Sequence, residues 1–86
     1  MSATLGPAKI PTPGRIIRRE LEARGWTQKD LARIMDRPEQ AISQIVRGRK
    51  RVTPETALEL ASAFGTSVDL WLNLEANYRL HRDRDE

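Results

Sequence analysis

Apolar residues along the chain recur three and four positions apart, which is the spacing of one face of an α-helix. The pattern divides into five short stretches, each bounded by residues that start or stop helices. No stretch alternates apolar and polar residues with a period of two, and no internal repeat is present. The pattern therefore predicts an all-α fold of five short helices.

The boundaries of these helices are marked by glycine and by hydroxyl residues. Glycine adopts the left-handed conformation that closes a helix, and a hydroxyl side chain accepts a backbone N–H at a helix start. Asp30, three residues after Thr27, completes the pattern of a capping box. The expected helices cover residues 15–24, about eight residues from residue 27 on, and residues 38–48, 54–64 and 67–80. The first, third and fourth helices are expected to end at Gly25, Gly48 and Gly65. The second, fourth and fifth helices are expected to begin at Thr27, Thr53 and Ser67.

The connection between the second and third helices is Asp36-Arg37-Pro38. Pro38 has no amide hydrogen and disfavours helical angles at Arg37, so it ends the second helix, yet it suits the first turn of the next one. The third helix is therefore expected to begin at Pro38. Its apolar residues face the core, namely Ala41, Ile42, Ile45 and Val46.

The opposite face of the third helix is polar, at positions i, i+3, i+4 and i+7. Two short helices joined by a tight turn can place the second helix in the major groove of DNA. Glutamine can pair with adenine, serine can contact several bases, and arginine can reach guanine or a phosphate. The alternative is that this stripe is only the solvated face of an amphipathic helix. The stripe consists of Gln40, Ser43, Gln44 and Arg47, and Arg37 would add a charge near the same groove.

Charge is distributed unevenly between the two halves of the chain. The net charge is +3 over 86 residues, but residues 1–51 hold twelve basic and five acidic side chains, and residues 52–86 hold three and seven. A basic first half suggests a nucleic-acid interface, although an unevenly charged solvated surface is the alternative.

The composition excludes several classes of protein. No cysteine is present, which excludes disulfides, thiolate zinc sites and cysteine nucleophiles. The single histidine, His81, assembles no metal set, and the glycines form no phosphate-binding loop. We therefore expect no enzyme and no cofactor. No apolar run could span a membrane and no secretion signal is present, so a cytoplasmic protein is expected.

The ends of the chain differ from its middle. Residues 1–12 are rich in proline and glycine and are expected to form a flexible arm, which could reach DNA, wrap a partner or stay disordered. Residues 81–86 alternate charges and are expected to form a frayed tail. The predicted domain therefore covers residues 13–80.

Several motifs together resemble a known family. Thr27-Gln28-x-x-Leu31-Ala32, Ile42-Ser43, Gly48 and Thr53-Pro54-Glu55-Thr56-Ala57-Leu58 resemble the Cro and lambdoid-repressor (XRE) helix-turn-helix family. Pro13-Gly14, Ala63-Phe64-Gly65-Thr66-Ser67 and Trp71-Leu72-Asn73-Leu74-Glu75-Ala76-Asn77-Tyr78 are similar to HigA-type antitoxins. The likeness covers about residues 13–79.

This resemblance implies a five-helix lambda-repressor-like DNA-binding domain. It further implies an autorepressor that neutralises a HigB-type toxin, a messenger-RNA endonuclease. Two alternatives stay open. One is a stand-alone phage- or mobile-element-type repressor without a toxin, and the other is an RNA-binding or protein-interaction module.

The resemblance also assigns roles to residues. It implies that Gln28 clamps a phosphate, that Gln40 and Gln44 read bases and that Ser43 and Arg47 reach bases or phosphate, with Arg49, Lys50 and Arg51 along the DNA backbone. The chain departs from the family in the turn, where Asp36-Arg37-Pro38 replaces the usual Gly-Val-Ser. The turn geometry and the role of Glu39 are therefore open: Glu39 could contact a base or act as a helix-start carboxylate.

A domain of this size reads few base pairs, so we expect a two-fold homodimer on an inverted repeat with half-sites ~34–36 Å apart. The last helix is the expected dimer or partner element, through Trp71, Leu74 and Tyr78. Core packing is the alternative for Trp71 and Leu74. The acidic residues could face a basic toxin or be ordinary surface charges, and they are Glu55, Glu59, Asp69 and Glu75.

Overall fold

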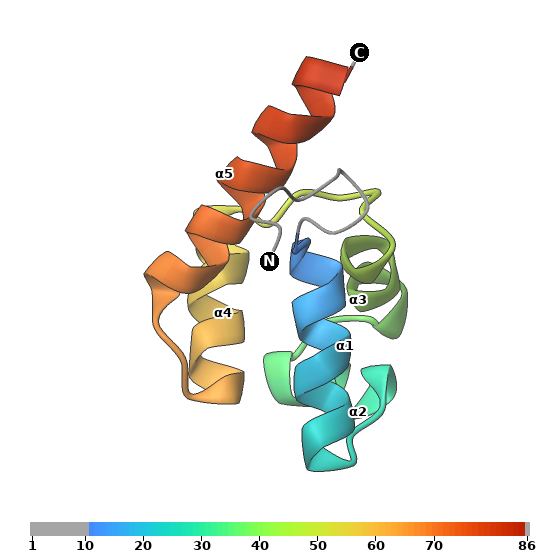
Figure 1. Cartoon of the computed structure of the whole chain (residues 1–86). Coiled ribbons are helices and arrows are strands. Elements are labelled where there is room, and N and C mark those ends of the chain that lie inside the picture. The colour runs from blue at the N-terminus through green and yellow to red at the C-terminus, as the bar shows by residue number, and fades with distance from the viewer. Residues whose placement is uncertain (1–10, 86) are drawn as a thin grey trace, which may run out of the picture.

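The computed structural model describes residues 11–85, and within that range it contains five α-helices and no β-strand (Figure 1). The five-helix prediction is confirmed. The expected arm at residues 1–12 lies almost entirely outside the described residues. The helices are α1 (Pro13–Arg24), α2 (Gln28–Met35), α3 (Glu39–Val46), α4 (Pro54–Phe64) and α5 (Val68–Asp85).

The predicted helix-capping interactions of the other helices are present, whereas α3 ends at Val46 with Arg47 as its C-cap, two residues before the predicted end at Gly48. The Thr27 hydroxyl accepts the Asp30 N–H at 3.1 Å, and the Asp30 carboxylate accepts the Thr27 N–H at 2.9 Å, which completes the capping box. Gly25 and Gly65 close their helices in the left-handed conformation, with φ of 69° and 71°. The hydroxyls that begin α4 and α5 accept N–H groups three residues ahead. Thr12, which was not predicted as a cap, does the same for α1.

The core receives one large side chain from every helix. The largest fully buried residues, each less than 2% exposed, are Ile17, Leu31, Ile42, Leu60 and Trp71, in the order α1 to α5. A small domain has a thin core, so each helix is needed to exclude water from the others. The buried Trp71 indole N–H donates to the Thr66 hydroxyl at 2.8 Å, which satisfies its one polar group.

The helices α1 and α3 approach closely at Gly14. A Cβ on Gly14 would lie 2.8 Å from the carbonyl carbon of Val46 and closer still to its oxygen. The start of α1 therefore rests directly on the backbone at the end of α3. This contact fixes α3, whose opposite face carries the candidate recognition residues.

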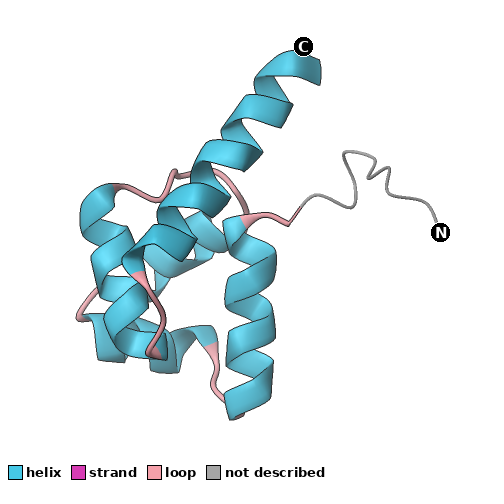
Figure 2. Ribbon diagram, turned by 60° about the vertical axis from the view of Figure 1, so that its left-hand side comes forward, coloured by secondary structure: helices cyan, strands magenta, loops and turns pink. Residues whose placement is uncertain are grey.

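The last helix is longer than the sequence pattern suggests. The helix α5 continues to Asp85, through residues for which a frayed tail is expected, and so extends beyond the predicted end at residue 80. No glycine or proline follows Gly65, so no such residue stops the helix, and arginine, which recurs in this segment, is a good helix former. The second half of α5 projects beyond the other four helices (Figures 1 and 2).

Candidate nucleic-acid interface

The turn between α2 and α3 is closed by Asp36 in the left-handed conformation, with φ 56° and ψ 48°. The Arg37 N–H donates to the Ala32 carbonyl at 2.9 Å, which completes the backbone closure of α2. Aspartate is among the few residues that tolerate this conformation. Asp36 therefore adopts the backbone geometry that favours glycine at this place, despite the different turn sequence.

The start of α3 differs by one residue from the prediction. Pro38 is the N-cap, with extended backbone, and the helix begins at Glu39. The Pro38 carbonyl accepts the Ala41 N–H at 3.0 Å, and no side chain caps this end of the helix. Glu39 is exposed in the first turn, where a carboxylate interacts favourably with the helix dipole.

The two faces of α3 divide as the sequence predicts. Ile42, Ile45 and Val46 are buried, whereas Ala41 is half-buried at the edge of the core. On the other side, Gln40 and Arg47 are exposed, and Ser43 and Gln44 are half-buried. The structure thus brings these four polar residues onto one accessible stripe.

A basic loop, residues 47–51, follows α3. Its exposed cations are Arg47, Arg49, Lys50 and Arg51. The Arg49 and Lys50 N–H groups both donate to the Gln44 carbonyl, at 2.8 and 3.2 Å. These two hydrogen bonds fold the backbone of the loop back over the end of α3, directly after the polar stripe.

Arg37, which is expected from the sequence to add its charge near this groove, forms an ion pair within the chain. Its guanidinium donates to both carboxylate oxygens of Glu59 in α4, at 2.6 and 3.1 Å, and lies 3.8 Å from Glu55. The hydrogen bonds that Arg37 donates to the Glu59 carboxylate raise the pKa of Arg37 above its usual value. Arg37 therefore ties the helix-turn-helix to α4, and its charge is largely compensated.

The remaining phosphate candidate, Gln28, is the first residue of α2 and is half-buried. It follows directly after Thr27 of the capping box. The Thr27 backbone N–H, which donates to the Asp30 carboxylate, lowers the pKa of Asp30 below its usual value. The start of α2 is thus a well-defined structural element beside Gln28.

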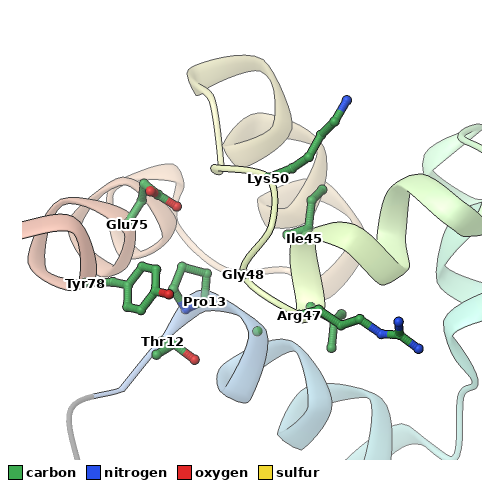
Figure 3. Close-up of a pocket in the computed structure, with 10 residues that line it drawn as sticks. Thr12, Pro13, Ile45, Arg47, Gly48, Lys50, Glu75 and Tyr78 are labelled. Atoms are coloured by element: carbon green, nitrogen blue, oxygen red, sulfur yellow. The ribbon is translucent and has the colours of Figure 1, made fainter. Parts of the chain in front are cut away.

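The three residues expected to form a dimer or partner surface have different environments. Trp71 is fully buried and packs beside Phe64, so it presents no surface to a second subunit. Leu74 is half-buried against the core. Tyr78 lines a cavity of about 150 Å³ between α5, the start of α1 and the end of α3 (Figure 3). Trp71 is therefore a core residue, which was the alternative to a role in dimer or partner contacts.

Two acidic residues that could have faced a partner are engaged within the chain. Glu59 pairs with Arg37, as described above. Glu75, in α5, accepts the Val52 N–H at 2.9 Å and pairs with Arg79 at 2.7 Å. Sequence reasoning missed the contacts with Arg37 and with the Val52 N–H, because these partners lie 22 and 23 residues away. The Glu75–Arg79 pair has the i,i+4 spacing of a helix, which is a local signal that could have found it.

Other kinds of site find no support in the part of the chain that the structure covers. Among residues 11–85 there is no group of three or more histidine, cysteine, aspartate or glutamate side chains able to hold a metal ion. None of the described helices combines the length and the apolar character needed to cross a membrane.

Comparison with known families agrees with this geometry. The model of the helix-turn-helix family HTH_3 matches residues 17–71. The chain therefore belongs to this family, whose members are DNA-binding transcription regulators and not enzymes. It is a helix-turn-helix regulator of the XRE type, as its motifs indicate.

Individual relatives are similar over most of their length. The uncharacterized HTH-type transcriptional regulator YddM of Escherichia coli is 33% identical over 73 residues, which cover 85% of this chain and 78% of the relative. Antitoxin HigA of Pseudomonas aeruginosa, solved with the higBA promoter, is 29% identical, with a TM-score of 0.80 and 86% and 82% coverage. An addiction module antidote protein of a HigA family from Coxiella burnetii is 33% identical, with a TM-score of 0.76 and 83% and 78% coverage.

Proposed function

We propose that this regulator is a sequence-specific repressor that binds an inverted-repeat operator as a homodimer and acts as the antitoxin of a HigB/HigA-type pair. One observation carries the DNA-binding part. The polar stripe of α3 is accessible, follows a closed turn and continues into a loop of exposed cations. This is the combination that direct base contacts and phosphate contacts require.

The stripe and the loop have different proposed roles. Gln40, Ser43 and Gln44 contact base edges, because their side chains carry the donors and acceptors that the major groove distinguishes. Arg47, at the end of α3, contacts either a base or the backbone, and Glu39, at its start, either accepts a hydrogen bond from a base or serves as a helix-start carboxylate. The proposed phosphate contacts come from Gln28, Arg49, Lys50 and Arg51, which set affinity and its dependence on salt.

The antitoxin part is supported by similarity. The Pseudomonas aeruginosa protein is an antitoxin that was solved with the promoter of its own pair, and the Coxiella burnetii protein is an addiction module antidote. We propose that this chain likewise represses its own operon. We also propose that it neutralises a small HigB-type toxin that cleaves messenger RNA.

Growth of cells tests the antitoxin proposal. The small open reading frame adjacent to this gene is expressed alone and together with this protein. We expect that the neighbour halts growth and that this protein restores it. A variant lacking the base-contact side chains, Gln40→Ala with Gln44→Ala, should still restore growth when both genes are driven by unrelated promoters.

A harmless neighbour would contradict the antitoxin proposal and favour the stand-alone repressor. The similarity to YddM, which is named only as a transcriptional regulator, is equally compatible with that function. Binding to the DNA upstream of the gene would then be the whole activity. Tighter binding to single-stranded RNA than to any duplex would contradict both proposals.

A further inference from the structure

The basic loop is attached to α5 at its end through Glu75. Val52, directly after the loop, is only 3% exposed, and its N–H donates to one carboxylate oxygen of Glu75 at 2.9 Å. Arg79 donates to the other oxygen through two nitrogens, at 2.7 and 3.2 Å. The Glu75 side chain is only 13% exposed. Each of its oxygens thus has a separate partner, and the carboxylate is fixed in orientation.

The same helix also meets the loop near its beginning. Gly48 has φ 77°, and a Cβ placed on it would lie 3.1 Å from the Tyr78 hydroxyl oxygen. Figure 3 shows the Tyr78 ring reaching from α5 toward Gly48, while Arg47 and Lys50 point away from it. Glu75 therefore holds the end of the loop, Tyr78 lies close to its beginning, and the exposed cations Arg49, Lys50 and Arg51 lie between these two contacts with α5.

A carboxylate at this position is unfavourable for DNA binding on charge alone. It lies next to cations that would approach a phosphate backbone, and its negative charge repels the same backbone. The hydrogen bond that this carboxylate accepts from Val52 has the opposite effect on DNA binding, because it orders the loop. A loop that is ordered before binding loses less conformational freedom on binding, which raises affinity.

We propose that Glu75 is a positioning residue for DNA binding, which acts by accepting the Val52 N–H and so holds Arg49, Lys50 and Arg51 in place for phosphate contacts. The proposal rests on the DNA-binding function proposed above. It assigns to α5 a role in DNA affinity that requires no DNA contact by Glu75 itself.

The test compares Glu75→Ala with Glu75→Gln. Glutamine keeps a carbonyl oxygen for the Val52 N–H, whereas alanine removes it, and both variants remove the negative charge. Binding is measured to a duplex from upstream of the gene and to a random duplex of equal length, over a series of salt concentrations. Arg51→Ala, which removes one loop cation, serves as the control for phosphate contacts.

We expect Glu75→Ala to bind both duplexes about 3- to 10-fold more weakly than wild type, with the slope of log K against log salt reduced by about one. Glu75→Gln should bind as tightly as wild type or more tightly. Hydrogen exchange of the Val52 amide should speed up in Glu75→Ala and stay slow in Glu75→Gln. Thermal melting of each variant verifies that binding is measured on folded protein.

The outcomes separate this proposal from the function on which it rests. A wild type that binds no duplex overturns the DNA-binding function itself. If wild type binds and Arg51→Ala weakens binding, but Glu75→Ala binds as well as Glu75→Gln, the positioning role of Glu75 is overturned. Equal losses in both Glu75 variants would also overturn it, because the loss would then follow the charge.

Discussion

Single residues of the interface fall into two chemical groups. Gln40 and Gln44 each carry an amide donor and an amide acceptor in fixed geometry, which suits the edge of one base. Arg49 and Lys50 are flexible, exposed cations, which suit a phosphate in any sequence. The structure places the first group on the rigid helix α3 and the second group in the loop after it.

Substitution of Gln44 tests this division. Gln44→Ala is expected to cost about 1–3 kcal/mol of binding free energy on the cognate operator and little on random DNA. Arg49→Ala is the matched control, and it should weaken binding to all DNA similarly and flatten the salt dependence. Titrations of both variants on both duplexes measure the difference. Equal losses of Gln44→Ala on both duplexes would contradict base recognition.

Another residue-scale prediction concerns the backbone of Asp36. A side chain in the left-handed conformation is strained, and aspartate reduces this strain by local hydrogen bonding. Asp36→Gly should leave the free energy of unfolding unchanged or raise it, whereas Asp36→Ala should lower it by about 1 kcal/mol. Urea denaturation with unchanged m-values measures both. Equal effects of the two substitutions would show that the left-handed conformation is not what matters here.

At the scale of elements, short helices depend strongly on their ends. The helices α2 and α3 have only eight residues each, too few to be stable alone in water. The capping box of α2 and the packing of α3 on α1 compensate for this. The two elements that form the helix-turn-helix are thus stabilised in different ways.

The capping box of α2 predicts a dependence of stability on pH. The pKa of Asp30 is lowered in the folded state, so its stabilising contribution is complete above its unfolded pKa of about 3.9 and is lost as pH falls through the folded value. Wild type should therefore be more stable than Asp30→Asn above about pH 4, and this difference in stability should shrink as pH is lowered below about 4. Melting temperatures of both proteins at a series of pH values measure this. A difference in melting temperature between wild type and Asp30→Asn that stays constant at all pH values would contradict this prediction.

The contact between α1 and α3 predicts a large effect of one methyl group. Gly14→Ala places a Cβ against the Val46 carbonyl, so the two helices must move apart. We expect a loss of about 1–3 kcal/mol in the free energy of unfolding. Arg19→Ala, at an exposed position of the same helix, should change it by less than about 0.5 kcal/mol. A neutral Gly14→Ala would mean that α1 does not rest on α3 as described.

At the scale of the whole molecule, one small domain offers a single short recognition helix. Its specificity on a genome is low unless two copies bind together, so the proposed homodimer follows from the size of the interface. The projecting half of α5, with Leu80 53% exposed, is the expected contact region between copies (Figure 2). Trp71 is excluded from that role by its burial.

A footprint on the upstream DNA tests this arrangement. We expect two protected half-sites related by a two-fold axis, with centres about 10–10.5 base pairs, or one helical turn, apart. Leu80→Glu, which places a charge on the projecting helix, should abolish the paired protection while leaving the monomer folded. A single protected half-site for wild type would contradict the dimer.

Much of the fold was predictable because its signals are local. Helix starts and stops at Thr27, Gly25 and Gly65 act over one to four residues, and the two faces of α3 follow from its periodicity. The candidate base-contact stripe was predictable for the same reason. The end of α5 was not, because no stop residue marks it and charge alternation alone does not unfold a helix.

The tertiary structure alone decided the remaining features. Arg37 pairs with Glu59, and Glu75 with the Val52 N–H, across 22 and 23 residues, and the burial of Trp71 depends on Phe64 of a different helix. For each of these side chains, the sequence alone offers either several equally plausible contact partners or none. The sequence by itself thus determined where the helices lie and which α3 face is polar, because those interactions are short-range. The packing of the helices decided which charges stay free for DNA and which are used within the fold, because such pairings depend on distances between segments that only the folded chain brings together.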